Sequence, residues 1–540
     1  MANRGEAADY YNGPPQQNSY YQMQEPSNKY PPPEQAPPQY GNGQHYVQPP
    51  NGPPPQNGSQ PTYSQPYGGE KQSFEQAFVI QGPKWHDLWA GVLFIAVFLG
   101  YAAVSGIAIQ GYSHTFSFNG GGIYNSRNDF GLSTNTIVLF AFVLLMAVLL
   151  SFAYMWAARA FTKQFIWITG ILNILFGFVT AIYMLSRKYW SGGIVFLLFS
   201  IFAVICFISW IPRIPFSVLM LQTSIDVSKR FGHVYMVSLV GGILATAFGA
   251  WYSVTLTAVY VKYEPSNSGT NPACRTGAGG CSQGKVIGLI VFITFAMYWI
   301  SEWLKNTIHT TISGVYGSWY FCGNNFPSGA TRGALKRSLT YSFGSISLGS
   351  LIVAIINMLR QLCSVAQQSA RQDGNIFGTI LFCCLQCLIG LLDWAVTFLN
   401  RYAFSHIALY GKSYLAAAKD TWKMIKDRGI DALVNECLIG PVLTMGATFI
   451  GYSCALLAYL YLIFTSPAYN ENGAYTPVVV AFAFLIGLQI CNIFTTPLSS
   501  GIDTIFVAMA WDPEVMMRDH PDLYQQMVAV YPHVQQAIHA

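Results

Sequence analysis

Ten long apolar runs, separated by short polar segments, dominate the chain from residue 88 onward. A helix needs about 20 apolar residues to cross the roughly 30 Å hydrocarbon core of a bilayer, and each run is about that long. A further apolar stretch after Pro497 can extend the tenth helix past a kink, which a helix bundle tolerates. The pattern predicts an all-α polytopic membrane protein with about ten transmembrane helices, at residues 88–109, 137–157, 165–185, 192–211, 234–261, 286–308, 339–359, 376–399, 438–464 and 476–496.

The composition of the chain is that of a membrane protein rather than a soluble one. Hydrophobic residues make up 52% of the 540 residues and charged residues only 9%, whereas ordinary soluble domains carry about 25% charged residues. Most of the chain therefore faces an environment other than water. The net charge of +5 creates no basic field, so nucleic acid is not expected as a partner.

Residues 1–84 differ from the rest because they are rich in proline, glutamine and tyrosine. They hold 16 of the 28 prolines, and such a segment cannot bury enough apolar surface to offset its ordering entropy. We expect a disordered tail with polyproline II character, to which SH3 or WW domains could bind. No apolar segment near Met1 has the pattern of a signal peptide, so we expect the tail to stay in the cytoplasm.

The basic residues predict how the ten helices are oriented. With both termini in the cytoplasm, 20 of the 28 Lys and Arg residues fall in cytoplasmic segments, and none lies in the middle of a predicted helix. This bias follows the positive-inside rule. We therefore expect a ten-helix transmembrane domain at residues 85–511, followed by a short cytoplasmic C-terminal tail at residues 512–540.

Two of the eleven cysteines, Cys274 and Cys281, lie in a glycine-rich segment between two predicted helices. The expected orientation places this segment outside the cell, where the environment is oxidising, so we expect the two thiols to form a disulfide. Most other cysteines lie in predicted helices, where a thiol packs as a small apolar group. Cys384 and Cys387 form a CxxC pair there, which is weak evidence for metal or redox chemistry.

Motifs typical of enzymes are missing from the sequence. The chain contains no GxxxxGK[ST], no HExxH and no GxSxG, and its nine histidines do not cluster. An enzyme embedded in a membrane would usually show acidic residues or histidines paired at short helical spacing. We therefore expect no enzymatic activity, no cofactor and no metal site.

Three segments of the sequence resemble the choline transporter-like family. They read EWLKNTIHTTISGVYGSWYF, SGATRGALKRSLTYSFGSISLGSLIVAIINMLR and FLNRYAFSHIALYGKSYLAAAKDTW, and the family patterns fall at Trp303–Phe321, Ser338–Leu351 and Leu399–Gly411. The resemblance covers about residues 84–515, and the tail is similar to that of fungal members. It implies ten helices, a plasma-membrane location and transport of choline or a related organic cation.

A carrier of choline needs groups that bind a quaternary ammonium, and aromatic faces and carboxylates do so. At the end of the sixth predicted helix, Trp299, Glu302, Trp303 and Asn306 are spaced i, i+3, i+4 and i+7, so they share one helix face. We interpret them as part of a substrate path. The alternative is an interfacial role, because tryptophan is enriched where helices leave the bilayer and Lys305 can pair with Glu302.

The eighth predicted helix carries a second candidate, Asp393 with its neighbour Trp394. An acid inside a membrane helix costs about 2.5–3.5 kcal/mol on insertion scales, so it usually faces the bundle interior and has a partner. We place both residues on the substrate path, with a structural hydrogen bond as the alternative role for Asp393. Asp503 and Glu436 lie near the ends of predicted helices and rank below Asp393.

These observations favour a membrane transporter that works by alternating access around an aromatic and acidic site between helices. Two other classes of protein stay open at this point: a membrane scaffold that acts through its N-terminal tail, and a membrane enzyme of lipid metabolism. Deleting residues 1–80 separates the first alternative, because a scaffold loses its function whereas a carrier keeps its uptake. Turnover in detergent without any gradient would indicate the enzyme.

Overall fold

The computed structural model describes residues 84–115, 134–263, 282–323, 327, 329–427, 437–466, 470 and 476–532. The predicted tail up to residue 83 and the predicted disulfide partners Cys274 and Cys281 lie outside these ranges. The disulfide therefore stays a prediction. The cysteines inside the ranges are free thiols. The chain divides into residues 12–70 and a second unit, to which all the described residues belong.

Long apolar helices form the bulk of the described residues, and ten of them are long and apolar enough to cross a membrane. This confirms the predicted all-α membrane fold. The expected helices match in number and order. They are α3 (Leu88–Thr115), α4 (Thr134–Ala160), α5 (Thr162–Ser186), α6 (Trp190–Trp210), α8 (His233–Tyr263), α10 (Gln283–Cys322), α12 (Phe343–Gln372), α13 (Ile376–Tyr410), α16 (Ile439–Thr465) and α17 (Thr476–Trp511).

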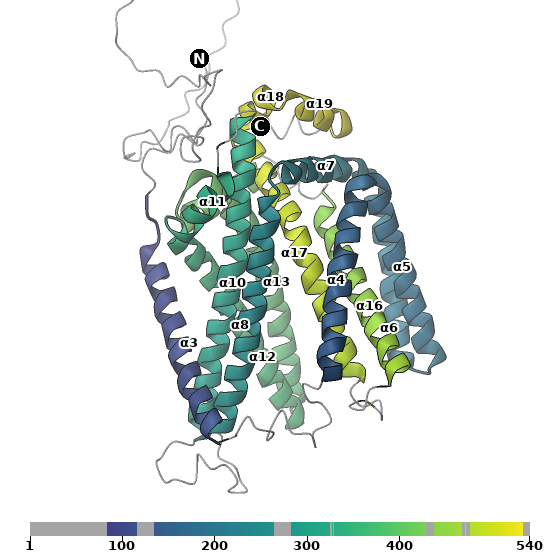
Figure 1. Cartoon of the computed structure of the whole chain (residues 1–540), viewed down its shortest axis with the longest axis vertical. Helices are drawn as coiled ribbons and strands as arrows, with labels where there is room; N and C mark the ends of the chain where they lie inside the picture. The colour runs from purple at the N-terminus through teal and green to yellow at the C-terminus, as the bar shows by residue number, and fades with distance from the viewer. Residues whose placement is uncertain are drawn as a thin grey trace, which may run out of the picture. The chain divides into compact units, whose positions relative to one another are not determined.

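Shorter helices gather at one end of the long ones, which we call the cap end; the opposite end is the far end. Figure 1 shows α7 lying across this end, with α18 and α19 near it and α11 beside α10. α7 lies flat because its sequence is amphipathic, and its apolar side chains are buried. The short elements are η1 (Ile211–Arg213), α7 (Ile214–Arg230), α11 (Ala330–Leu339), α14 (Tyr414–Asp427), α18 (Pro513–Asp519) and α19 (Pro521–Val530).

Several long helices continue well past the apolar runs that predict them. α10 ends at Cys322 instead of near residue 308, and α13 ends at Tyr410 instead of near residue 399. Arg360 and Arg401, which lie just past the ends of the predicted helices, are therefore inside α12 and α13. Both pair with an acid on another helix, which makes the position tolerable. α17 also continues through Pro497 to Trp511, as the apolar stretch there allowed.

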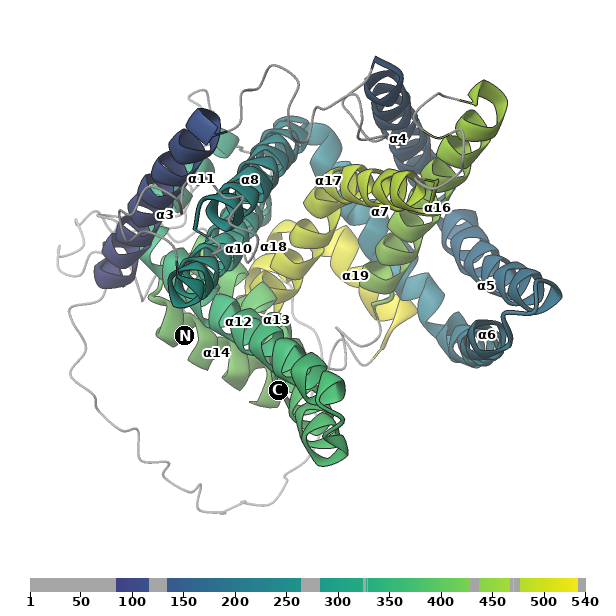
Figure 2. The same cartoon turned by 90° about the horizontal axis from the view of Figure 1, so that it is seen from below.

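The long helices form two bundles, seen along their axes in Figure 2. The first bundle consists of α3, α8, α10, α12 and α13, and the second of α4, α5, α6, α16 and α17. Each bundle has its own buried core: Phe94, Trp299 and their neighbours in the first, and Leu139, Ala447 and theirs in the second. A third core lies at the cap end and joins both bundles to α7, α18 and α19.

The bundles touch where α17 packs against α10, α13 and α8. Small residues allow this close approach, which matters in lipid because packing rather than the hydrophobic effect holds helices together. At Gly501 of α17, a Cβ atom would overlap the ring of Tyr316 on α10. The Tyr316 hydroxyl in turn donates to the carbonyl oxygen of Ser224 on α7 at 2.9 Å. One half of α17 is thus fixed to the first bundle and to the cap end.

Candidate functional site

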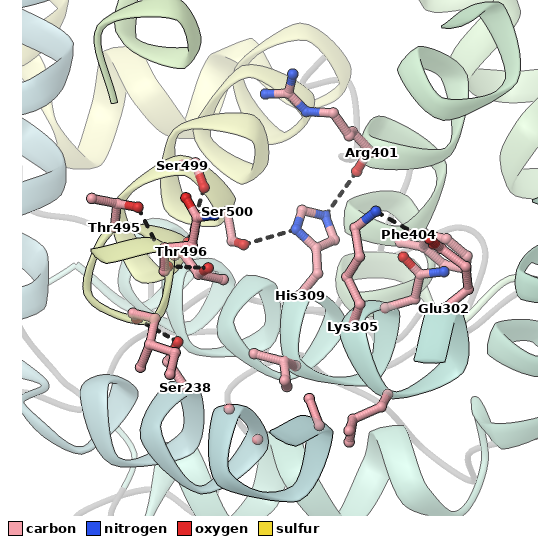
Figure 3. A pocket seen from close by; sticks show the side chains of 18 of the residues that line it. Ser238, Glu302, Lys305, His309, Arg401, Phe404, Thr495, Thr496, Ser499 and Ser500 are labelled. Carbon is pink, nitrogen blue, oxygen red and sulfur yellow. Dashed lines mark hydrogen bonds and ion pairs between the residues drawn. The ribbon is translucent and has the colours of Figure 1, made fainter. Parts of the chain in front are cut away.

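A cavity of about 650 Å³ lies between the two bundles, and Figure 3 shows the side chains around it. Its size is typical of small-molecule sites, which span about 300–1,000 Å³. α8, α10, α12 and α13 supply one wall, and α16 and α17 supply the other. Any relative motion of the bundles therefore changes the shape of this cavity.

The exposure of the lining residues differs between the two ends of the cavity. Ser301 on α10 and Gln489 on α17 lie nearest the far end, and both are exposed. Asn400, Ser500 and Asp503 lie nearer the cap end, and all three are buried. The wall around Asp503 is therefore more buried than the wall at the far end, although Thr444 on α16 is exposed as well.

The charged groups in the cavity wall occur as two ion pairs. Lys305 Nζ contacts Glu302 Oε2 at 3.3 Å, within a single turn of α10. Arg401 on α13 binds Asp503 on α17 through two parallel bonds, Nε to Oδ2 at 3.0 Å and Nη2 to Oδ1 at 2.7 Å. Such bidentate pairs are among the strongest charge-assisted contacts. The first pair lies on one helix, whereas the second connects the two bundles.

His309 connects three helices, and Figure 3 shows it between Ser500 and Arg401. Its Nδ1 lies 2.8 Å from Ser500 Oγ on α17, and its Nε2 lies 2.9 Å from the carbonyl oxygen of Arg401 on α13. The carbonyl can only accept, so Nε2 carries a proton and, in the neutral ring, Nδ1 accepts from the serine. His309 therefore fixes the backbone at Arg401 relative to α17.

A proline interrupts α17 at the level of the cavity. Pro497 has no N–H to donate to the carbonyl of Ile493, one turn earlier. Ser238 on α8 replaces the missing donor, because its Oγ lies 2.6 Å from that carbonyl oxygen. The two halves of α17 are thus joined at a weak point, and the half beyond it carries Asp503.

The structure distributes the four predicted residues of α10 between two environments. Glu302 and Asn306 line the cavity, and Asn306 Nδ2 donates to Ser350 Oγ on α12 at 2.9 Å. Trp299 and Trp303 are not among the lining residues. Both rings pack on Phe94 of α3. The predicted helix face is therefore shared between the cavity and the helix packing.

The predicted residues of α13 lie away from the main cavity. Asp393 Oδ2 accepts a bond from Arg360 Nη2 on α12 at 2.7 Å, which is the structural partner considered as an alternative. Trp394 is exposed and stacks on Phe398. Trp394 also lines a second, smaller cavity that borders the main one.

Sequence reasoning missed Arg401 and His309 and ranked Asp503 too low, although all three line the cavity. The eighth predicted helix ended at residue 399, so Arg401 was assigned to a loop. Its signal was the continuing apolar pattern of YAFSHIALY, which marks a longer helix. The cavity lining also includes the aromatic ring of Phe404. Within the described residues, no three His, Cys, Asp or Glu side chains could hold a metal ion together.

Comparisons with known proteins agree with this architecture. The family described as plasma-membrane choline transporter matches residues 194–514. The protein named PNS1 of Gibberella zeae is 62% identical over 99% of both chains, and pns1 of Aspergillus fumigatus is 61% identical over the same shares. PNS1 of Saccharomyces cerevisiae is 42% identical over 86% of this chain and 87% of its own length. The chain therefore belongs to the plasma-membrane choline transporter family, which confirms the resemblance in its sequence and identifies it as a multi-pass membrane protein.

Proposed function

We propose that the protein carries choline or a related organic cation across the plasma membrane by alternating access. The main cavity supports this proposal most directly, because it lies between two bundles and contains two carboxylates, Glu302 and Asp503. Alternating access needs a central site whose walls belong to parts that move against each other. The cavity, whose wall is exposed at Ser301 and Gln489 and buried around Asp503, would be the outward-facing one of the two states.

The cap end faces the cytoplasm in this proposal, with both chain termini on that side. The distribution of Lys and Arg supports the orientation, because 20 of the 28 fall in segments assigned to the cytoplasm. α7, α11 and α18 each carry basic residues in the last turn, at the cap end. The cavity then opens to the outside of the cell.

Glu302 is the first group to meet the cation. Its partner Lys305 is 64% exposed, and the contact of 3.3 Å joins residues three positions apart on one helix. Exposed pairs of this kind contribute only about 0–1 kcal/mol, so Lys305 can leave without much loss. The ammonium of the substrate then takes its place, and the amide oxygen of Asn306 can accept a hydrogen bond from the hydroxyl of choline.

The tryptophans act less directly in this proposal. Trp299 and Trp303 hold the cavity-lining turn of α10 against α3, and the Trp299 Nε1–H donates to the Ser347 carbonyl of α12 at 2.9 Å. Trp394 lines the smaller cavity and belongs to the substrate path. Asp393 orders α12 and α13 through Arg360 and supports the path from outside.

Uptake of labelled choline into liposomes that contain only the purified protein tests the function. We expect uptake above that of protein-free liposomes, with inhibition by unlabelled choline but not by a neutral analogue in which carbon replaces the nitrogen. The variant lacking residues 1–80 should keep this uptake. An absence of uptake by folded protein would contradict the proposal, and loss of function on deleting residues 1–80 would favour the scaffold.

A further inference from the structure

The Arg401–Asp503 pair lies between two cavities. The main cavity is lined by both residues, and so is the second cavity, of about 320 Å³. Ser499 and Gly440 are the other two residues common to both linings. The pair and these two small residues therefore form the partition between the cavities.

The second cavity reaches from this partition to the cap end along α16 and α17, and along α13 it extends the other way as far as Trp394. Its other walls come from Trp210 at the end of α6, Arg213 in η1, Cys437 before α16 and Phe506 on α17. η1 connects directly to α7, and the start of α16 is bound to α7 because the Leu438 N–H donates to Ser217 Oγ at 2.8 Å. A molecule that passes the pair and reaches the wall formed by Trp210 and Arg213 has therefore moved towards the cap end.

The two members of the pair can separate without leaving a charge unbalanced. The Arg401 side chain is 43% exposed and its guanidinium already lies 5.8 Å from the centre of the Tyr402 ring, whose face can stabilise a cation. Asp503 is only 5% exposed, so its carboxylate needs another cation when Arg401 leaves. A cation bound in the main cavity can replace Arg401 as the partner of the Asp503 carboxylate.

The chain also has a point at which such a movement can occur. Asp503 lies less than two turns beyond Pro497, where α17 has lost one of its own hydrogen bonds. The donor from Ser238 replaces that bond from a different helix. The segment that carries Asp503 can therefore tilt relative to the rest of α17 at a low cost in backbone hydrogen bonding.

We infer that the Arg401–Asp503 ion pair is the gate between the main cavity and the cap side of the membrane, and that a substrate cation opens it by replacing Arg401 at the Asp503 carboxylate. The inference rests on the proposed transport of an organic cation and names the residues that couple binding to opening. No bond is made or broken; one cation replaces another. His309 is a positioning residue for the gate, because it holds the Arg401 backbone against α17.

The accessibility of the main cavity from the cap side tests the gate. The variant Thr444→Cys introduces a thiol on α16 in the lining of the main cavity only. In vesicles with the cap side outward, a membrane-impermeant maleimide is added and the labelled peptides are quantified by mass spectrometry. Combining Thr444→Cys with Asp503→Asn should raise the labelling rate of this thiol at least tenfold, because the partition has lost one of its two charges.

Two comparisons make the result specific. Asp226→Asn is the matched control, since Asp226 also pairs with a basic residue, Lys229 on α7, but lies outside both cavities. It should leave the labelling rate unchanged. Cys437 is an internal reference on the cap side of the partition. Burial raises its pKa to about 12, so it reacts slowly, and its rate should change far less than that of the introduced thiol.

A second measurement does not depend on the acidic variants folding. Saturating choline should raise the labelling of the Thr444→Cys protein that keeps Arg401 and Asp503, and the neutral analogue should not. Unchanged labelling in a folded protein carrying Asp503→Asn would overturn the gate, and unchanged labelling with choline in a protein that takes up choline would overturn its opening by the substrate. If the protein takes up no choline but Asp503→Asn still raises labelling, the proposed substrate is wrong and the gate stands.

Discussion

Two ion pairs on α13 show how the same chemistry serves different purposes. Asp393 binds Arg360 of α12, and Arg401 binds Asp503 of α17, each with a closest contact of 2.7 Å. The first pair joins two neighbours within one bundle. The second joins the two bundles, has two parallel bonds, and holds a carboxylate that is 5% exposed compared with 21% for Asp393.

The difference shows that position relative to the boundary between bundles decides what an intramembrane ion pair does. A pair inside one bundle keeps its geometry while the bundles move, so it stabilises a packed unit. A pair across the boundary is made or broken by the movement itself. Its free energy therefore contributes to the difference between the two states of the carrier.

The two ion pairs should differ most in the loss of stability when the arginine of each pair is replaced. Arg401→Ala leaves the Asp503 carboxylate buried without its partner, which costs about 3–5 kcal/mol for buried pairs. Arg360→Ala should cost less, about 1 kcal/mol, since Asp393 is four times as exposed as Asp503. Thermal unfolding in nanodiscs compares the two variants directly. Equal losses would remove the distinction between the pairs.

A smaller effect is expected at Glu302, the acid with the weakest partner. Glu302→Gln keeps the shape and removes the counter-charge, so the affinity for choline should fall about tenfold, equivalent to about 1.4 kcal/mol. Trp303→Leu should lower the amount of folded protein instead, because its ring packs on Phe94 and Phe343. Uptake measured together with surface level separates these outcomes. Normal affinity in Glu302→Gln would favour Asp503 as the substrate carboxylate.

A smaller loss of stability is expected when the hydrogen bond that bridges α17 at Pro497 is removed. Ser238→Ala removes the donor to the Ile493 carbonyl and should lower stability by about 1 kcal/mol. Hydrogen exchange should increase beyond Pro497, around Asp503, and stay unchanged around Asp393. Ser238→Thr keeps the hydroxyl and is the control. Faster exchange at both ion pairs alike would mean that α17 has no local joint.

The smallest change in stability is expected when the pH is lowered below about 6.5. Burial lowers the pKa of His520, which stacks on Trp319 and lies 3.0 Å from the Tyr320 carbonyl oxygen. Because the folded pKa is below the unfolded value of about 6.5, stability is complete above that pH and falls as the pH drops from 6.5 through the folded pKa. α18 and α19 should loosen from α10 over this range, as hydrogen exchange would report. His520→Gln should remove this pH dependence.

The sequence predicts the helices well because their length and apolar content are set by the bilayer, which every span meets in the same way. It predicts their ends poorly. Past the predicted ends at residues 308 and 399, α10 and α13 continue as helices that pack at the cap end; for example, the Tyr410 hydroxyl donates to Asp512 Oδ2 at 2.8 Å. Such contacts join residues about a hundred positions apart, and a hydropathy pattern contains no record of them.

The same limit applies to the site. Helical spacing predicts that Trp299, Glu302, Trp303 and Asn306 share one face of α10, but spacing cannot say which neighbour each side of that face meets. Trp299 meets α3, whereas Glu302 meets the cavity. The pairing of Arg401 with Asp503 depends on two helices from different bundles. Only the packed structure brings these two residues together.

The hydrogen bond from Ser238 to the Ile493 carbonyl also affects how the protein inserts into the membrane during synthesis. A backbone carbonyl without a donor costs several kcal/mol in hydrocarbon, so α17 alone is an unfavourable membrane segment at that point. Ser238 lies on α8, which precedes α17 in the chain and enters the membrane earlier during synthesis. The Ile493 carbonyl of α17 thus gains a hydrogen-bond donor only when α17 packs against α8. Correct assembly of the two bundles is in this way a condition for stable insertion of the final segment.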